Sequence, residues 1–117
     1  GYYAMGIIND INTENTHGYK LYKELVKKYK TAALDNTMNI WAFSAAMDLC
    51  EVLKRAGKDL TREGAIKAAE TMSNFDNGIG VPITWSPTQR DGGRMVKIYK
   101  AEKGNWVPKT KWIALVN

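Results

Sequence analysis

Apolar residues recur at helical spacing in three separate stretches of the chain. In residues 18–30 they fall three and four positions apart, and lysines fill the other faces. These apolar positions are Tyr19, Tyr22, Leu25, Val26 and Tyr29. Residues 38–56 are apolar almost throughout and leave polar surface mainly at Asp48 and Glu51, which predicts a mostly buried helix. A narrower stripe, rich in alanine, extends to Met72 and predicts a third helix with a small packing face.

The ends of the second and third helices are marked by local signals. Lys54 and Arg55 stand where the dipole of the second helix favours cations, and Gly57 can adopt the left-handed conformation just past its last turn. Thr61 is a candidate N-cap for the third helix, with Glu63 in the first turn. We therefore expect a break between residues 56 and 62.

Shorter apolar runs predict strands at both ends of the chain. Residues 2–8 read as a buried strand that ends in the turn-forming pair Asn9 and Asp10. Residues 81–85 form a short extended segment, which Pro82 restricts to an edge strand or a linker. Residues 95–101 and 112–116 read as a terminal meander around a turn at 102–105 and a break at Pro108. The predicted class is α/β, with about three helices and four to five strands.

The charge balance does not single out a nucleic-acid partner. The chain has 117 residues, 17 Lys and Arg against 12 Asp and Glu, and a formal net charge of +5. Its cations are spread out, and the densest group recurs at helical spacing opposite the apolar stripe of residues 18–30. This group comprises Lys20, Lys23, Lys27, Lys28 and Lys30. A solvated helix face explains it better than a nucleic-acid patch.

The sequence offers no catalytic set. It contains one histidine, His17, at a predicted helix start, and one cysteine, Cys50, within an apolar run. We interpret His17 as a surface or capping residue and Cys50 as core packing. No spacing typical of a metal site or a phosphate loop occurs, so we predict neither a metal nor another cofactor, and no enzymatic activity.

The start of the second helix is a candidate ligand site. Residues 35–41 combine amide, hydroxyl, thioether and indole groups at a helix end where backbone N–H groups are free. Such an end can face a small polar ligand. Helix capping and entry into the core explain the same residues, so both interpretations stay open from composition alone.

Three short segments together resemble type I periplasmic binding proteins of the branched-chain amino-acid transporter class. Residues 53–63 read LKRAGKDLTRE, similar to the family's stretch Ala-Leu-x-x-Ala-Gly-x-Asp-x-Thr-Arg-Glu. Residues 80–87 read GVPITWSP and precede a DGG turn at 91–93, similar to the family's Gly-Pro-Ile-x-Phe-Ser-Pro segment. VKIY at 96–99 and GNW at 104–106 resemble its closing strand and turn. The resemblance lies in their order and spacing.

The resemblance implies the C-terminal portion of a fold with two α/β lobes and a solute in the cleft between them. Residues 1–10 would be a strand of the second lobe, and residues 11–85 the helical part of the first. Residues 86–117 would return as a crossover and place the final strands beside the first strand. In this family the start of the second helix approaches the cleft, which makes Met38 and Asn39 the candidate ligand-binding residues. The family's other gripping loops lie mostly upstream of such a segment.

The function implied by the resemblance is capture of a small solute without chemistry. The solute would be a branched-chain amino acid or a similar small carboxylate or amide, delivered to the membrane permease of an ABC transporter. The location would be periplasmic or extracellular, with membrane association in a Gram-positive source. A ligand-sensing domain of a receptor or regulator on the same fold is the alternative. Since the chain begins inside a predicted strand, we also expect a piece of a longer protein whose open faces favour self-association.

Overall fold

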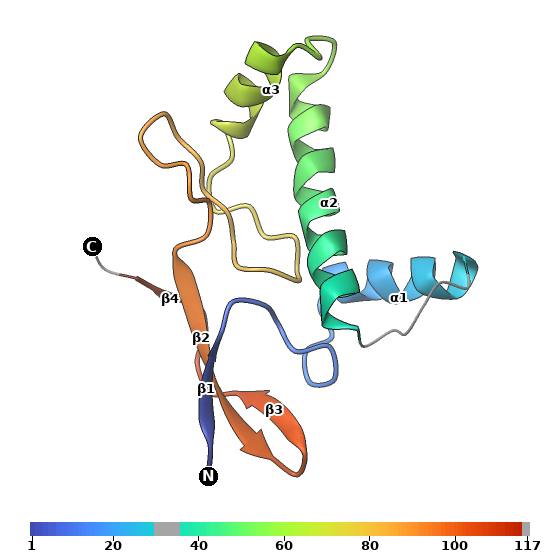
Figure 1. Ribbon diagram of the computed structural model, residues 1–117, viewed down its shortest axis with the longest axis vertical. Coiled ribbons are helices and arrows are strands. Elements are labelled where there is room, and N and C mark those ends of the chain that lie inside the picture. The colour runs from blue at the N-terminus through green and yellow to red at the C-terminus, as the bar shows by residue number, and fades with distance from the viewer. Residues whose placement is uncertain (30–35, 116–117) are drawn as a thin grey trace.

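The computed structural model describes residues 1–29 and 36–115 and confirms the three predicted helices (Figure 1). They are α1 (His17–Tyr29), α2 (Thr37–Ala56) and α3 (Arg62–Ala69). The predicted caps are in place: Gly57, at φ 62°, donates its N–H to the Leu53 carbonyl, and the Thr61 hydroxyl accepts from the Gly64 amide at 3.0 Å. Asn36 caps the start of α2 by accepting from the amides of the next turn.

The strands form one antiparallel sheet. It contains β1 (Tyr3–Gly6), β2 (Met95–Glu102), β3 (Asn105–Pro108) and β4 (Ile113–Ala114). The long β2 lies between β1 and β3, and β4 pairs with its other end. The predicted return of the final strands beside the first is thus confirmed by the β1–β2 pairing.

Two strand predictions differ from the structure. Sequence analysis assigned a turn and a break to the segment that forms β3, because Pro108 cannot donate to a ladder. Pro108 is tolerated at the last position of this outer strand, where it stands opposite Tyr99. The predicted burial of the first strand is also wrong, since Tyr3 and Met5 are 63% and 68% exposed. The sheet covers neither side chain, and no described helix lies over them.

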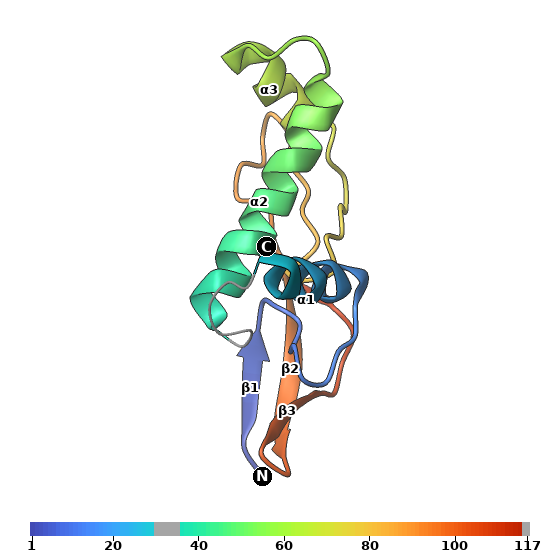
Figure 2. The ribbon, with the colours of Figure 1, turned by 90° about the vertical axis from the view of Figure 1, so that its right-hand side faces the viewer.

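Helices and sheet are joined by two extended segments rather than by direct packing. Within the described residues no helix lies against a strand, and β1, β2 and β3 lie in the lower part of Figures 1 and 2 while α2 and α3 lie above them. Residues 7–9 run antiparallel to residues 79–81, where the Val81 amide donates to the Ile7 carbonyl at 2.9 Å. The Asn9 amide likewise donates to the Ile79 carbonyl at 2.7 Å. The predicted extended segment after Gly80 therefore makes isolated bridges and not a full strand.

The core is divided into two apolar clusters. One holds Tyr19, Tyr22, Ile40 and Ile79, which confirms that the first two tyrosines of α1 serve packing. The other holds Val52, Ala68 and Met72 between α2 and α3. Gly18 permits the close approach of α1 to the loop at residues 77–79, because a Cβ there would lie 2.2 Å from the Asn77 carbonyl oxygen.

The prediction that α2 is mostly buried is wrong, because its inner face holds Ile40, Ser44, Asp48 and Val52 and most of its other residues are exposed. Asp48, predicted as surface, is buried, whereas Leu49 is 58% exposed and Cys50, predicted as core, is exposed. The physical reason is Asn77, whose side-chain amide donates to the Ser44 hydroxyl at 2.9 Å and to Asp48 Oδ1 at 2.8 Å. A buried polar network thus holds Asp48 on the inner face of α2, on the same side as the buried Ile40 and Val52.

Candidate functional site

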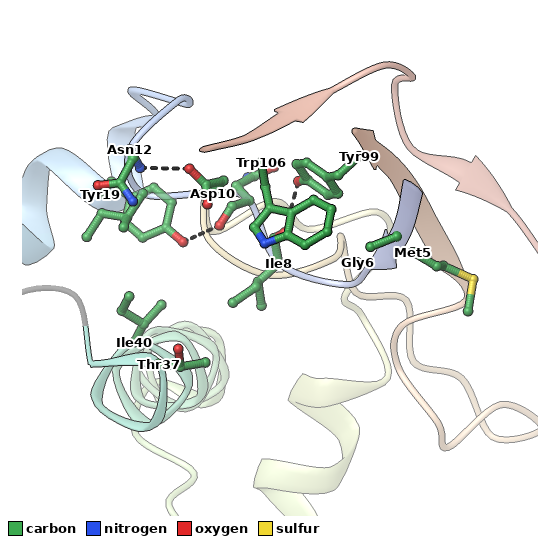
Figure 3. A pocket seen from close by; sticks show the side chains of 13 residues that line it. Met5, Gly6, Ile8, Asp10, Asn12, Tyr19, Thr37, Ile40, Tyr99 and Trp106 are labelled. Carbon is green, nitrogen blue, oxygen red and sulfur yellow. Dashed lines mark hydrogen bonds between the residues drawn. The ribbon is translucent and has the colours of Figure 1, made fainter. Parts of the chain in front are cut away.

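A pocket lined by polar and apolar residues lies where the sheet, α1 and α2 converge. It has a volume of about 390 Å³ and is open on one side. Figure 3 shows Thr37 and Ile40 of α2 facing the other lining residues across this pocket. The opposite wall combines side chains from the loop after β1 and from three other elements. These include Ile8, Asp10, Tyr19, Tyr99 and Trp106.

Two phenols anchor this wall to the segment that joins sheet and helices. Tyr19 donates its hydroxyl to the Asn9 carbonyl, and Tyr99 donates to the Ile8 carbonyl at 2.9 Å and to Glu14 at 2.8 Å. Burial raises the pKa of both phenols, and neighbouring carboxylates raise each pKa further. Both therefore stay neutral and act as hydrogen-bond donors. One comes from a helix and the other from a strand, so together they hold residues 8 and 9 in place.

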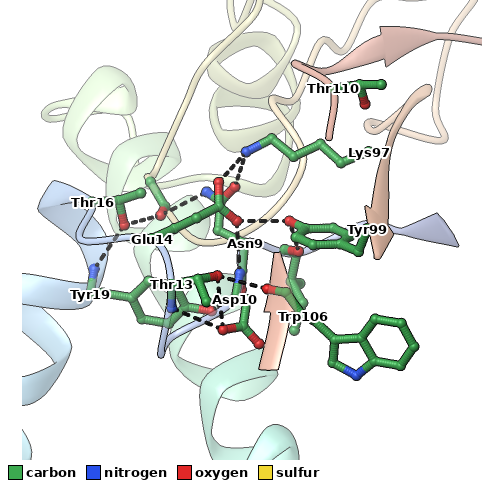
Figure 4. Close-up of polar contacts among 12 residues, drawn as sticks. Asn9, Asp10, Thr13, Glu14, Thr16, Tyr19, Lys97, Tyr99, Trp106 and Thr110 are labelled. Atoms are coloured by element: carbon green, nitrogen blue, oxygen red, sulfur yellow. Dashed lines mark hydrogen bonds and ion pairs between the residues drawn. The ribbon is translucent and has the colours of Figure 1, made fainter. Parts of the chain in front are cut away.

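A polar cluster beneath the pocket ties residues 9–16 to β2 (Figure 4). Lys97 Nζ lies 2.5 Å from Glu14 Oε1 and 2.6 Å from Asn9 Oδ1, and it stands 4.7 Å from the centre of the Trp112 ring. Both charged side chains of the pair are largely shielded from solvent. Since Glu14 also accepts from Tyr99, its carboxylate is fully engaged within the protein.

Asp10 has a different position, because it lines the pocket itself. Its Oδ1 accepts from the amides of Asn12 and Thr13, both at 3.0 Å, which holds the carboxylate in a tight turn. Thr13 in turn donates its hydroxyl to the Trp106 carbonyl at 2.8 Å. This contact fastens the backbone of β3 at Trp106 to the turn.

The structure places the two predicted site residues near the pocket but not in its lining. Met38 is 75% exposed, and Asn39 borders a separate shallow hollow with Tyr22 and Tyr29. Thr37 and Ile40, three positions apart and on one helix face, line the pocket instead. The helix start therefore reaches the pocket, while a ligand-binding role for Met38 and Asn39 stays a prediction.

The single histidine and the single cysteine do not form a site in the structure. His17 is exposed at the first position of α1, as expected for a surface residue, and lies on a different element from Cys50. Asp35 of the predicted helix start and Lys30 of the lysine group lie outside the described residues. In residues 1–29 and 36–115, no three His, Cys, Asp or Glu side chains gather as a metal site would require.

Sequence reasoning missed Asp10, Trp106 and Tyr99 as pocket residues. Asp10 signalled only a turn, and Trp106 and Tyr99 fell in predicted strand or turn segments. The useful signal was the polar pair after an apolar strand, since such pairs occur where the chain leaves a sheet.

Over the described part of the chain, no helix has the length and apolar character needed to cross a membrane.

Comparisons with known proteins identify the fold. No protein-family model matches the sequence, and no curated protein matches it. A solved structure is similar, namely the crystal structure of a branched chain amino acid ABC transporter from Thermus thermophilus with bound valine. Sequence identity is 23% and the TM-score is 0.83, with 98% of this chain and 34% of that chain covered. The chain thus spans about a third of the length of that protein, and its α/β fold is similar to that part of the solved structure.

Proposed function

We propose that this chain is part of the solute-binding component of an ABC importer and that the pocket holds a small solute. The solute is a branched-chain amino acid or a similar small carboxylate or amide. The observation that carries the proposal is the composition of the pocket. Tyr19 and Ile40 come from the predicted first lobe, and Tyr99 and Trp106 come from the predicted second lobe.

The fold supports this assignment. The similar solved structure is described as a branched chain amino acid ABC transporter with bound valine, so a protein of this architecture accommodates a small amino acid. A pocket between two bodies can close on a solute when the bodies rotate about the segments that join them. Here those segments are residues 7–9 and 79–81, which pair with each other beside the pocket. The lobe boundaries at residues 10 and 85 belong to this proposal.

Delivery of the solute requires a membrane partner. In the proposed role the partner is the permease of an ABC importer, and the location is periplasmic or extracellular, with membrane association in a Gram-positive source. Binding is the whole function of the component, and no bond of the solute is made or broken.

The test is calorimetric titration of the protein as encoded, in parallel with the 117-residue chain. The probes are L-valine, L-leucine and their amides, with glucose and adenosine monophosphate as unrelated solutes. Trp106→Ala should weaken binding about tenfold, equal to about 1.4 kcal/mol of lost apolar contact. Leu60→Ala is the control, because Leu60 is 68% exposed, lies outside the predicted helix start at residues 35–41 and does not line the pocket.

Met38→Ala tests the predicted helix-start contact in the same titration. Loss of its apolar contact should weaken solute binding by about 1 to 2 kcal/mol, with little change in thermal stability because the side chain is exposed. Binding of adenosine monophosphate or glucose alone would contradict the proposed solute class. Equal affinity of Trp106→Ala and the parent protein would contradict the assignment of the pocket.

A further inference from the structure

We infer that Asp10 is the subsite for a cationic group of the ligand, an amine or ammonium nitrogen. The inference rests on the proposed function and narrows its ligand class to compounds that carry such a group. It starts from the charge of the pocket. Among the described residues that line the pocket, Asp10 is the one that carries a charge.

Within the described residues, Asp10 forms no ion pair. Lys97 is committed to Glu14 and to Asn9 Oδ1, and its pair with Glu14 is shielded from solvent. Lys23, on α1, donates its Nζ to the Ile11 carbonyl at 3.4 Å and does not pair with Asp10. Among the described residues, the Asp10 carboxylate therefore has no ion-pair partner at the pocket wall. A partly buried carboxylate in that situation favours a cation.

The carboxylate is held in position before any ligand arrives. Asp10 Oδ1 takes the hydrogen bonds from Asn12 and Thr13, whereas no hydrogen bond to Oδ2 is found in the described part of the chain. The turn thus fixes one oxygen and leaves the other for a ligand. A fixed acceptor loses little freedom on binding, which favours a specific contact.

The neighbouring rings suit the same ligand. Figure 3 shows Tyr19 and Trp106 near Asp10, with the apolar side chains of Ile8 and Ile40 in the same pocket. An indole ring attracts a cation through its π face, and an aliphatic body can lie against the isoleucines. A ligand with its carboxylate at this end would instead meet Asp10 as a like charge. The pocket end therefore selects an amine nitrogen followed by an apolar group.

The experiment compares three probes that share the branched hydrocarbon chain of leucine, on the protein as encoded. They are L-leucine, 3-methylbutan-1-amine, which lacks the carboxylate, and 4-methylpentanoate, which lacks the amine. We expect the two amine-bearing probes to bind the parent protein at least about tenfold more tightly than 4-methylpentanoate. Asp10→Asn keeps an oxygen for the turn and should abolish this preference. Asp91→Asn is the control, since Asp91 is exposed, paired with Arg94 and distant from the pocket lining.

Each result decides one of the two proposals. A preference for amine-bearing probes that disappears in Asp10→Asn, with an unchanged circular dichroism spectrum, supports the subsite. Equal binding of L-leucine and 4-methylpentanoate, or an amine preference that survives in Asp10→Asn, overturns the subsite and leaves the solute-binding function in place. Failure of every probe, together with failure of the valine and amide titrations, overturns the proposed function and the subsite with it. If Asp10→Asn does not fold, the subsite is tested by the same probe comparison on the parent protein and on Asp10→Glu.

Discussion

Replacement of the buried Asn77 by Ala should destabilise the protein more than replacement of an exposed polar side chain. Asn77 is 3% exposed, and its Oδ1 accepts from the amides of Ile79 at 2.8 Å and Gly80 at 3.0 Å. Its Nδ2 donates to Ser44 and to the buried Asp48 carboxylate. One side chain thus joins the inner face of α2 to the segment that pairs with residues 7–9.

The magnitude follows from the groups left without partners. Two buried amides lose their acceptor at about 1 kcal/mol or more each, and a buried carboxylate loses a donor at about 1.5 to 3 kcal/mol. We therefore expect Asn77→Ala to lower the free energy of unfolding by about 3 to 5 kcal/mol, a large part of the stability of a typical domain. Urea unfolding followed by tryptophan fluorescence and by far-ultraviolet circular dichroism measures it.

Two further variants give the measurement its control. Asn105→Ala alters an exposed asparagine at the first position of β3 and should change the free energy of unfolding by about 0.5 kcal/mol or less. Asn77→Asp keeps an acceptor for both amides but sets a second carboxylate against Asp48, so its loss should grow as the pH rises. A change below about 1 kcal/mol for Asn77→Ala would refute the reasoning, because the network would then add little to stability.

Two other predictions concern pH and association. Burial raises the pKa of Asp48, opposed by its hydrogen bond from Asn77, so its contribution to stability is complete at low pH and is lost as the pH rises through the raised pKa. Asp48→Asn should therefore gain free energy of unfolding relative to the parent protein between about pH 3 and about pH 7, and a constant difference in urea titrations would contradict this. The isolated 117-residue chain should self-associate at micromolar concentration, because Tyr3, Met5 and Leu49 are exposed. Light scattering that shows a stable monomer would argue against it.

The helix boundaries were predictable because their causes are local. Thr61 caps the amide three residues ahead, and Gly57 closes the preceding turn with a residue four positions back. Such contacts are encoded within one or two turns of sequence, so propensity and capping rules suffice to locate them. The pairing of the first and last strands came from the resemblance to a known family, not from the local pattern.

The inward position of Asp48 on α2 could not be predicted, because the residue that holds it there, Asn77, lies far along the chain. Asp48 and Asn77 are 29 residues apart, and an isolated helix gives no sign that one acidic residue will turn inward. The usual rule places apolar side chains of a helix inward and charged ones outward, and here a buried amide holds one acidic side chain inside. Likewise β3 is a short strand that begins with Asn105 and ends with Pro108, both unfavourable in strands. The hairpin at Lys103 and Gly104, both at positive φ, sets it beside β2.

The pocket was invisible to sequence reasoning for a related reason, since each of its residues already has a complete local role. Tyr19 looks like helix core, Tyr99 like a strand residue and Asp10 like a turn former, and all three interpretations are correct. The site exists because the two phenols donate to adjacent carbonyls, those of Asn9 and Ile8, from opposite sides of the joining segment. The position of Asp10 therefore depends on the helix and the sheet at once, and a shift of either moves the carboxylate relative to the other pocket residues.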